Sequence, residues 1–447
     1  YSFLMINKIN SILFLLALVG MYCFFLFLPP QFVSQGEKRK LAEFPKLTYK
    51  SYLNGTWAHS MDDFIDDHFP FRDKFISMAD IFHASKGIHF RHQEKIFIGN
   101  KRKQVKPNEE DTNHVKINFK DDFEEGYSGS LLILDGSVYP VGGGDPRMSK
   151  YFSAMLNEYA SKLSGRVRVF SVVAPLSSAF IPALKYRKYN NQNKATLLAI
   201  KNSLANGAIF CDVFNELDKH GNEKMYFSTD HHWNATGAYY AYVAFCRGAG
   251  IPPVELNKME KKIKYNFLGS LYQLTRDPSV KANPDTLVYY VPMVTTTAVR
   301  FNENNFNNPI KASVFSHKSS GGNTYLTFLG GDAPLMKITT SVKNGKKAVV
   351  VKNSMGNAFS VYLISHYEEI YVVDFRYSNH NLIDLIEKNK INDLIFALGL
   401  YGAMSNGTIN MMRHLAVNNG VPKYVPPAVE SDTNKIVTPL IDTLIIE

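Results

Sequence analysis

The chain has 447 residues, of which 45% are hydrophobic and 20% charged, a composition that excludes a largely disordered protein. The formal net charge of +10 comes from dispersed basic residues and short clusters such as 101–106 (KRKQVK). None of these clusters lies in a known nucleic-acid-binding motif, so we expect a solvated surface and no nucleic acid partner. The three cysteines, Cys23, Cys211 and Cys246, exclude a disulfide scaffold and leave one optional bridge, between Cys211 and Cys246.

The most apolar stretch is 11–28 (SILFLLALVGMYCFFLFL), 18 residues without a charge that are followed by Pro29 and Pro30. As a helix it nearly spans the hydrocarbon core of a bilayer. No small-residue cleavage site follows it, so we expect an uncleaved transmembrane anchor over 9–30. Because large domains translocate largely regardless of their charge, we expect the rest of the chain to lie outside the cytoplasm.

Residues 31–118 are polar and charge-dense, with apolar residues at helical intervals on both sides of Pro70. This spacing predicts a membrane-proximal helical region. From 119 to 413, short β-forming runs alternate with helical patterns, which is typical of an α/β fold with a doubly wound parallel sheet. Within this domain we expect an insertion of irregular or β structure around 264–323. A poorly ordered extension is expected at 414–447.

The expected elements of the α/β domain follow one another along the chain. They are a hairpin around Asp135-Gly136, a helix at 148–165, strands at 166–175 and 208–217, a strand from Ala348, a helix at 354–366, a strand at 370–375, a helix at 382–390 and a strand at 393–400.

The stretch 226–245 (YFSTDHHWNATGAYYAYVAF) places an aspartate, two histidines and a tryptophan directly before a helical pattern. Asn234 is positioned to cap that helix, so 230–233 form the preceding loop. In open α/β sheets, such loops carry the functional sites. We expect His232 to act as a base, with Asp230 two residues earlier accepting a hydrogen bond from its Nδ1.

Two other interpretations of this loop remain open. In the first, the aspartate only caps the loop while the histidines and Trp233 pack. In the second, Asp230, His231 and His232 hold a metal ion, although no second cluster at ligand spacing is present. We expect no metal and no cofactor, and we expect His231 to point away from the base because neighbouring residues of an extended chain face opposite sides.

The best candidate nucleophile is Ser354, in 346–367 (KKAVVVKNSMGNAFSVYLISHY). A run of apolar β-formers ends at Lys352, which predicts that Ser354 sits at a turn from strand into helix. There its hydroxyl projects from the sheet edge, and the N–H groups of the first helical turn are available to an oxyanion. The alternative is that Ser354 only caps the helix. The G-x-S-x-G elbow is absent.

Four ordered motifs of this sequence together resemble the DHHW protein family, over roughly 37–412. They are 37–47 with 62–75 (EKRKLAEFPKL, DDFIDDHFPFRDKF), 229–233 (TDHHW), 325–338 (YLTFLGGDAPLMKI) and 349–377 (VVVKNSMGNAFSVYLISHYEEIYVVDFRY). That family is similar to the SGNH-hydrolase-like domains of bacterial alginate and cellulose O-acetyltransferases. The resemblance implies an SGNH-like α/β fold in which Asp230, His232 and Ser354 form the triad. The motif order is circularly rearranged relative to better-known SGNH enzymes, which a triad tolerates because it depends on geometry and not on chain order.

The resemblance also implies an activity and partners. We expect a membrane-anchored O-acetyltransferase acting on an exopolysaccharide or cell-wall glycan, supplied with acetyl groups by a multi-spanning membrane acyltransferase. An acetyl esterase would need the same triad. The third alternative is an inactive glycan-binding or scaffold protein of the export machinery, because Asn353 stands where the family pattern leads us to expect an aspartate.

Further residues are weaker candidates for the oxyanion or substrate pocket. They are Asn353, Asn357, Arg376, Gly331, His231 and Trp233.

Overall fold

The computed structural model describes residues 39–72 and 130–418, except 143, 164, 182–183 and 302–307, together with the short pieces 13–16, 19–20, 33–34, 74–75, 78 and 94–98. By its internal contacts the chain divides into two compact units, 1–90 with 273–279 and 91–272 with 280–447. Most of the predicted anchor and most of the predicted C-terminal extension lie outside the described residues. Among the helices that are described, none has both the length and the apolar character needed to cross a membrane.

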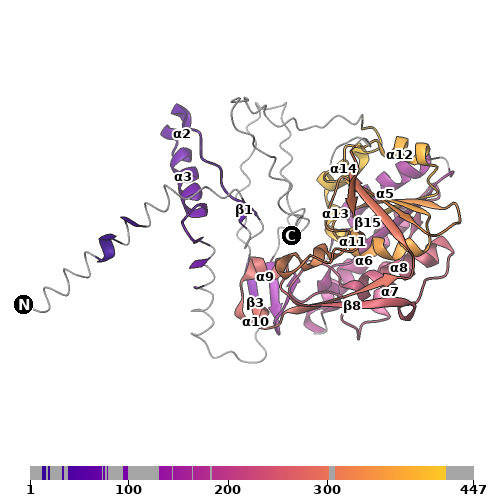
Figure 1. The fold of residues 1–447 in the computed structure, drawn as a ribbon, viewed down its shortest axis with the longest axis horizontal. Helices are drawn as coiled ribbons and strands as arrows, with labels where there is room; N and C mark the ends of the chain where they lie inside the picture. Colours follow the sequence, from indigo (N-terminus) through magenta and orange to yellow (C-terminus); the bar gives the residue numbers. More distant parts are fainter. Residues whose placement is uncertain are drawn as a thin grey trace, which may run out of the picture. The chain divides into compact units, whose positions relative to one another are not determined.

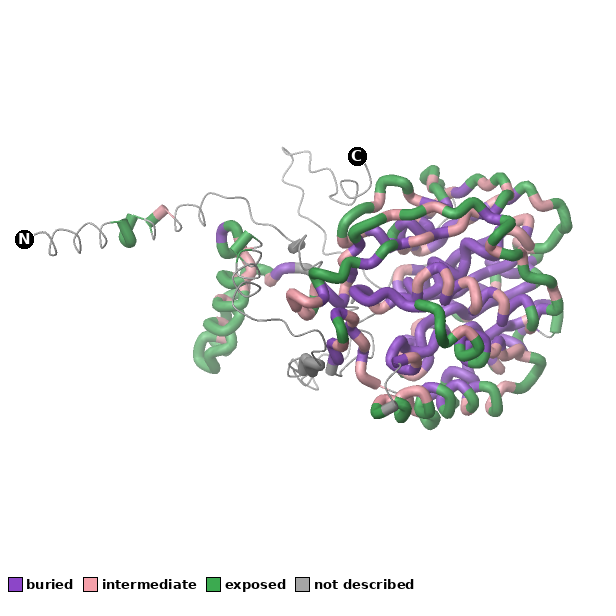
Figure 2. Tube along the Cα trace, turned by 90° about the horizontal axis from the view of Figure 1, so that it is seen from below, coloured by how far each residue is buried: buried purple, intermediate pink, exposed green. Residues whose placement is uncertain are grey.

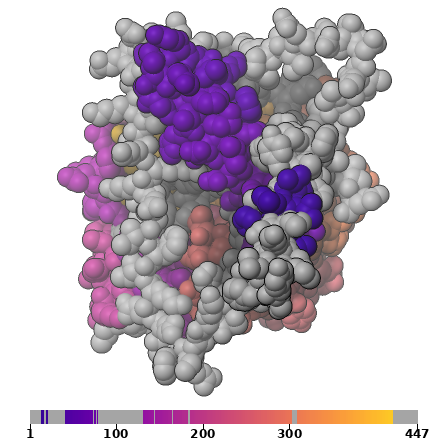
Figure 3. Space-filling view, turned by 90° about the vertical axis from the view of Figure 1, so that its left-hand side faces the viewer, coloured from indigo at the N-terminus to yellow at the C-terminus, as the bar shows by residue number. Residues whose placement is uncertain are grey.

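Among its described residues, the first unit has two short helices in the region where the sequence favours helices. They are α2 (Tyr49–Leu53) and α3 (Thr56–Asp67), preceded by the paired strands β1 (Val33–Ser34) and β2 (Arg39–Lys40). A capping box starts α2, because the Thr48 side chain accepts from the Ser51 N–H and the Ser51 side chain accepts from the Thr48 N–H. None of the residues of α3 is buried. Figure 3 shows the atoms of this helical region as one contiguous purple block.

Within the described residues, the main sheet of the second unit has eight strands. In spatial order they are β11 (Ile310–Ala312), β10 (Thr296–Phe301), β12 (Leu335–Thr340), β14 (Glu369–Asp374), β13 (Lys347–Lys352), β15 (Asp393–Gly399), β6 (Arg168–Ala174) and β7 (Ile209–Phe210). The strands from β14 to β7 are parallel, and β12, β10 and β11 continue the sheet antiparallel.

The parallel part of the sheet is covered by helices on both faces, as predicted. Because successive side chains of a strand alternate, Ala348 and Val350 of β13 join one apolar cluster and Val349 and Val351 join the other. The first cluster includes residues of α7 (Val213–Asp218), α8 (Ala235–Ala249) and α11 (Met355–Ser360). The second includes residues of α5 (Pro146–Lys162), α6 (Arg187–Ser203), α12 (Leu382–Asn389) and α14 (Asn406–His414). Figure 2 shows this buried trace in purple through the middle of the unit.

The helices and 3₁₀ turns described from residue 146 onward lie between the strands or, for the last two, after the final strand (Figure 1). They are α5 (Pro146–Lys162), η1 (Ser177–Phe180), η2 (Leu184–Tyr186), α6 (Arg187–Ser203), α7 (Val213–Asp218), α8 (Ala235–Ala249), η3 (Leu256–Lys258), α9 (Ser270–Thr275), α10 (Pro278–Lys281), η4 (Gly321–Thr327), α11 (Met355–Ser360), η5 (Val361–Ser365), α12 (Leu382–Asn389), α13 (Leu400–Met404) and α14 (Asn406–His414).

Two features differ from the sequence expectations. The sheet is mixed and not wholly parallel, because β12 pairs antiparallel with β14. The strands β10 and β11, which fall inside the expected insertion, extend this edge. The sequences of these two strands do not indicate which strand they pair with. Only the structure shows that β10 pairs with β12 and so belongs to the main sheet. In addition, β3 (Glu94–Ile98) lies in the region expected to be helical and pairs with β4 (Ser130–Leu134).

The predicted hairpin at Asp135-Gly136 is confirmed, since β4 pairs antiparallel with β5 (Ser137–Pro140). Both turn residues have positive φ, 49° and 75°, as a type I′ turn requires. A second antiparallel pair is formed by β8 (Met259–Phe267) and β9 (Asp285–Pro292). Cys211 and Cys246 are both buried and free, so the optional disulfide is not formed.

Candidate active site

The loop that carries the aspartate and the histidines is closed on itself. Tyr226 and Trp233 form an antiparallel bridge, and the Phe227 N–H donates to the His232 carbonyl. The Asn234 side chain accepts from the Gly237 N–H, which confirms the predicted cap of α8. We predicted that this loop directly follows a strand over 208–217. Instead, β7 ends at Phe210, and α7 lies between it and the loop.

A buried carboxylate on β9 holds the start of this loop. Asp285 accepts from the backbone N–H groups of Ser228 and Thr229, at 2.9 and 2.7 Å, and from the Thr229 hydroxyl. Lys224 forms an ion pair with the same carboxylate at 2.7 Å. Because these bonds fix the two residues before Asp230, the direction in which the loop continues is set by a residue far away in sequence.

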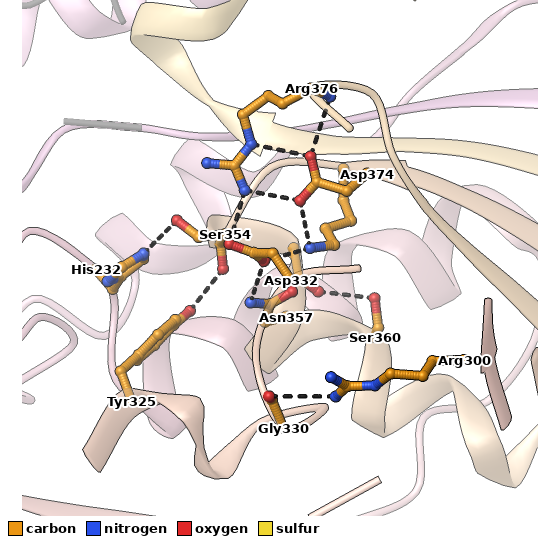
Figure 4. A network of polar contacts seen from close by, with 12 residues as sticks. His232, Arg300, Tyr325, Gly330, Asp332, Ser354, Asn357, Ser360, Asp374 and Arg376 are labelled. Carbon is orange, nitrogen blue, oxygen red and sulfur yellow. Dashed lines mark hydrogen bonds and ion pairs between the residues drawn. The ribbon is translucent and has the colours of Figure 1, made fainter. Parts of the chain in front are cut away.

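Asp230, His232 and Ser354 form a continuous chain of hydrogen bonds. The Nδ1 of His232 lies 2.5 Å from Asp230 Oδ1, and its Nε2 lies 2.5 Å from Ser354 Oγ. Ser354 is 122 positions from His232 in sequence, so the fold brings together the residues that the sequence proposed. His232 and Ser354 are only 6% and 8% exposed, which limits the access of water to the bond between them. Figure 4 shows the histidine directed at the serine hydroxyl.

The Asp230 carboxylate is built to stay charged. Burial alone would raise its pKa, but the neighbouring His232 and the hydrogen bond between the two hold that pKa well below its usual value. Its second oxygen accepts from the N–H and the hydroxyl of Ser270, at 2.9 and 3.1 Å. Gly269 allows this approach, because a Cβ there would overlap the Asp230 side chain. A charged, fully bonded carboxylate orients the imidazole so that Nε2 faces the serine.

Ser354 occupies the predicted turn between β13 and α11, but its side chain makes no capping hydrogen bond. The hydroxyl is directed to His232 instead, and this geometry does not fit a residue that serves only as a cap. Gly356 permits the tight turn, since a Cβ there would lie 2.5 Å from Lys352 Cβ and 2.8 Å from the Ala397 carbonyl oxygen. The helix can therefore lie directly on the sheet with its first residue at the edge.

Trp233 and His231 contact different partners. The indole Nε1 of Trp233 donates to the Met355 carbonyl at 2.9 Å and thereby ties the loop to the first turn of α11. The Nδ1 of His231 lies 2.7 Å from the Ser270 hydroxyl, and its ring packs against that of His232 at 3.8 Å between centroids. The prediction that His231 points away from the base is therefore wrong: residues 228–232 form a series of bends and not an extended strand, so the His231 ring lies against the His232 imidazole.

These contacts fit a metal site less well than they fit a serine paired with a histidine. Asp230, His231 and His232 have ligand atoms within 4.8 Å of one another. However, Asp230 Oδ1 and His232 Nδ1 face each other, and His232 Nε2 faces Ser354. A metal ion would have to replace these hydrogen bonds, so we favour the serine interpretation.

A ring of charged side chains lies next to the serine, and we call it the charged ring: Asp332, Lys352, Asp374 and Arg376. Asp332 is partly exposed and the other three are buried. Lys352 Nζ contacts Asp332 at 2.5 Å and Asp374 at 2.7 Å. Arg376 contacts the same two carboxylates at 2.8 and 2.7 Å. Burial would raise the pKa of Asp332, but the two cations hold it well below its usual range. Asn357 of α11 donates to Asp332 at 2.9 Å, which connects the ring to the helix of the serine (Figure 4).

The remaining pocket candidates are placed as follows. Arg376 belongs to the charged ring and is buried. The Oδ1 atoms of Asn353 and Asn357 are buried and have no hydrogen-bond partner among the described residues. The Gly331 N–H donates to the Phe328 carbonyl at 3.3 Å, so this donor is engaged within its own turn.

Several residues around the triad were missed from the sequence. Ser270, Asp285, Tyr325, Asp332 and Lys352 were not proposed as site residues, although three of them lie inside the motifs 325–338 and 349–377. Their roles depend on contacts between distant segments, such as Asp285 with Ser228. One signal was available in the sequence: Lys352 ends an apolar run typical of a buried strand. A lysine buried there requires carboxylate partners.

Several solved structures are similar to this chain. The O-acetyltransferase domain of Pseudomonas putida AlgJ is similar at 12% identity, over 63% of this chain and 95% of that chain, with a TM-score of 0.32. PatB1 of Bacillus cereus is similar at 18% identity, over 62% and 98% of the two chains, with a TM-score of 0.52. Its structure with a sulfonyl adduct is similar at 16% identity, over 63% and 96%, with a TM-score of 0.51. At these identities the two PatB1 structures support the fold alone.

A DHHW family protein from Eubacterium siraeum is similar at 33% identity, over 63% of this chain and 94% of that chain, with a TM-score of 0.58. Among proteins with curated descriptions, none matches the sequence. The profile of the DHHW protein family matches residues 37–119 and 103–373, which together cover most of the chain. The chain therefore belongs to the DHHW family.

Proposed function

We propose that this protein transfers O-acetyl groups to an exopolysaccharide or cell-wall glycan through an acetyl-serine intermediate on Ser354. The observation that carries the proposal is the chain of hydrogen bonds from Asp230 through His232 to Ser354. A serine hydroxyl is a weak nucleophile until an adjacent base removes its proton, and His232 is placed to do so. Asp230 keeps the proton on Nδ1, so that Nε2 is the basic nitrogen.

In the first half-reaction, Ser354 Oγ attacks the acetyl carbonyl carbon of the donor, and its proton passes to His232 Nε2. The bond between the carbonyl carbon and the leaving oxygen then breaks, and that oxygen takes the proton from His232. In the second half-reaction, a glycan hydroxyl gives its proton to His232 and attacks the acetyl-serine carbonyl. The Ser354 oxygen leaves and recovers the proton. We place the oxyanion of both steps near the Ser354 N–H.

The cellular setting follows from the sequence and belongs to the proposal. We infer that residues 11–28 anchor the chain in the cell membrane and that the catalytic unit lies outside the cytoplasm. The acetyl group then has to cross the membrane, for which a multi-spanning acyltransferase partner is required. Amino-terminal sequencing of membrane-extracted protein tests the anchor, because a chain that begins near Gln35 would show that the stretch is removed.

Two other functions are tested by the same experiment. An acetyl esterase uses water in place of the glycan hydroxyl. An inactive scaffold is favoured by Asn353, which is buried beside Ser354, has an unpaired Oδ1 among the described residues and carries no charge. Asn353→Asp is therefore an informative variant, since a gain in turnover would mark this chain as a weakened enzyme.

The experiment is the turnover of p-nitrophenyl acetate with and without a soluble glycan acceptor, followed by mass spectrometry of Ser354. Acetylated Ser354 together with acetylated glycan supports the transferase. Release of acetate at a rate that is independent of the glycan supports the esterase. If wild-type protein forms no acetyl-serine, and a fluorophosphonate also fails to label Ser354, the scaffold is favoured. In an active enzyme, Ser354→Ala abolishes the adduct and His232→Ala costs nearly as much, because triad members act as a unit.

The metal alternative predicts a different pattern of losses. It requires equal losses from His231→Ala and His232→Ala, together with activity that depends on an added divalent cation. The contacts of the two rings instead predict a milder loss for His231→Ala, since only His232 faces the serine.

A further inference from the structure

One tyrosine contacts two members of the triad at once. Tyr325, in η4, places its ring parallel to the His232 imidazole, at 3.7 Å between centroids and 9° between planes. Its hydroxyl donates to the Ser354 carbonyl oxygen at 3.0 Å. Figure 4 shows the tyrosine spanning from the histidine to the backbone of the serine.

The tyrosine is held in this position by its own neighbours. Its ring meets those of Phe227 and Phe328 edge-on, at 6.4 and 5.4 Å between centroids. The turn of η4 is fixed by Thr324 and Thr327, whose hydroxyls donate to the Gly321 and Thr324 carbonyls at 2.7 Å. The side chain is buried, so it does not swing between orientations in solvent.

We propose that Tyr325 is a positioning residue that stabilises the His232 imidazolium during acyl transfer and holds the Ser354 carbonyl in place. This inference rests on the serine-histidine nucleophile of the proposed function. When Ser354 attacks, its proton moves to His232, and the imidazole becomes a cation. A cation against the face of an electron-rich ring is stabilised, and the effect is larger when water is excluded.

The two halves of the tyrosine have separable roles. The ring acts on the charge that develops on His232, and the hydroxyl acts on the first turn of α11. Trp233 holds the next carbonyl of the same turn, at Met355. The carbonyls of Ser354 and Met355 are therefore each fixed by a side chain from another segment, and the nucleophile keeps its distance from the base.

Other groups also contact His232 and influence how easily its imidazole takes up a proton. Asp230 faces Nδ1, the His231 ring packs on the imidazole, and Ser354 faces Nε2. Asp230 favours the imidazolium through its charge. Because none of these groups changes in a Tyr325 variant, a change in the pH dependence of Ser354 reactivity reports on the tyrosine ring.

The test is the rate at which phenylmethanesulfonyl fluoride modifies Ser354 in the full chain, measured from pH 5 to pH 9. In this reaction the Ser354 oxygen bonds to sulfur, fluoride leaves with the bonding electrons, and the serine proton passes to His232. No glycan or acetyl donor is needed, so the test separates the serine-histidine pair from the transfer reaction.

Three variants are compared with the wild type. Tyr325→Leu removes the ring, so the rising limb of the pH profile should move to lower pH by about 0.5–1 unit, because the cation is less stabilised. Tyr325→Phe keeps the ring and removes the hydroxyl, so the plateau rate should fall about two- to fivefold without a shift of the limb. Phe328→Leu removes a buried ring from the same cluster and should leave the limb in place.

Each outcome bears on the inference. A shift in Tyr325→Leu that is absent from Tyr325→Phe and Phe328→Leu supports it. If the rising limb lies at the wild-type pH in all three variants, the inference is overturned. Equal shifts of the limb in Tyr325→Leu and Phe328→Leu also overturn it. If the wild type is not modified at Ser354, the proposed function and this inference both fail, whereas a reactive wild type with an unshifted Tyr325→Leu overturns this inference alone.

Discussion

Replacing Lys352 by methionine should destabilise the fold strongly, because it breaks the charged ring. Lys352 is 1% exposed and Asp374 is fully buried, and the two lie 2.7 Å apart. Without the ammonium, Asp332 and Asp374 share a single cation, Arg376, and one negative charge stays uncompensated. Removing one partner of a buried ion pair typically costs about 3–5 kcal/mol. A loss of that size is a large share of the 5–15 kcal/mol or so that stabilises a typical protein.

The assay is urea unfolding of the purified protein at pH 7, followed by tryptophan fluorescence. The matched control is Lys347→Met, at the other end of the same strand. Lys347 pairs with Glu369 at 2.9 Å and is 28% exposed, so its loss should cost only about 0–1 kcal/mol. Adding Asp332→Asn to Lys352→Met restores neutrality and should recover part of the lost stability. Equal unfolding midpoints for Lys352→Met and Lys347→Met would refute the reasoning.

Three further changes test the triad and the pH dependence of stability. Asp230→Asn should lower the rate of Ser354 sulfonylation by about 10³–10⁴-fold with unchanged folding, because an amide favours the wrong imidazole tautomer; a loss below tenfold would contradict this role. Gly269→Ala should push the Asp230 carboxylate aside and cost about 10²-fold in the same assay, whereas Gly221→Ala, where a Cβ meets only ordinary contacts, should be neutral. Glu369 has a pKa of about 2, because Lys337, Lys347 and Tyr371 overcome the effect of burial. Its contribution to stability is therefore complete above the unfolded-state value near pH 4.5 and lost as the pH falls toward 2, so Glu369→Gln should flatten the unfolding free energy over that range; an unchanged slope would contradict the assignment.

Much of the parallel sheet and the triad was predictable from local sequence. The apolar run of β13 ends at Lys352, and a turn into a helix follows within two residues, which is enough to place Ser354 at the sheet edge. The spacing of Asp230 and His232 allows their side chains to meet without any tertiary information. Each of these two predictions depends on residues that are close together in the chain, whereas the contact between His232 and Ser354 crosses 122 positions and has no local signal.

The antiparallel edge of the sheet and the support of the triad were not predictable in the same way. The Ser270 bonds to Asp230 cross 40 positions, and the Tyr325 bond to the Ser354 carbonyl crosses 29. A serine or tyrosine carries no local sign of which distant group it will meet. The β10 sequence is equally compatible with an isolated strand and with the edge of the main sheet, since strand propensity says nothing about the partner.

The four neighbouring residues Asp230, His231, His232 and Trp233 are linked to one another and to two other segments, at Ser270 and in α11, and this explains why they occur together. A hydrogen-bonded dyad requires Asp230 and His232 on the same side of the loop, and one residue must separate them. His231 fills that position and bonds Ser270, which in turn bonds the second oxygen of Asp230. Trp233 then ties the loop to the carbonyl of Met355, the residue after the serine. Four successive residues of one loop thus place the His232 imidazole, its carboxylate partner and the contact with the first turn of α11.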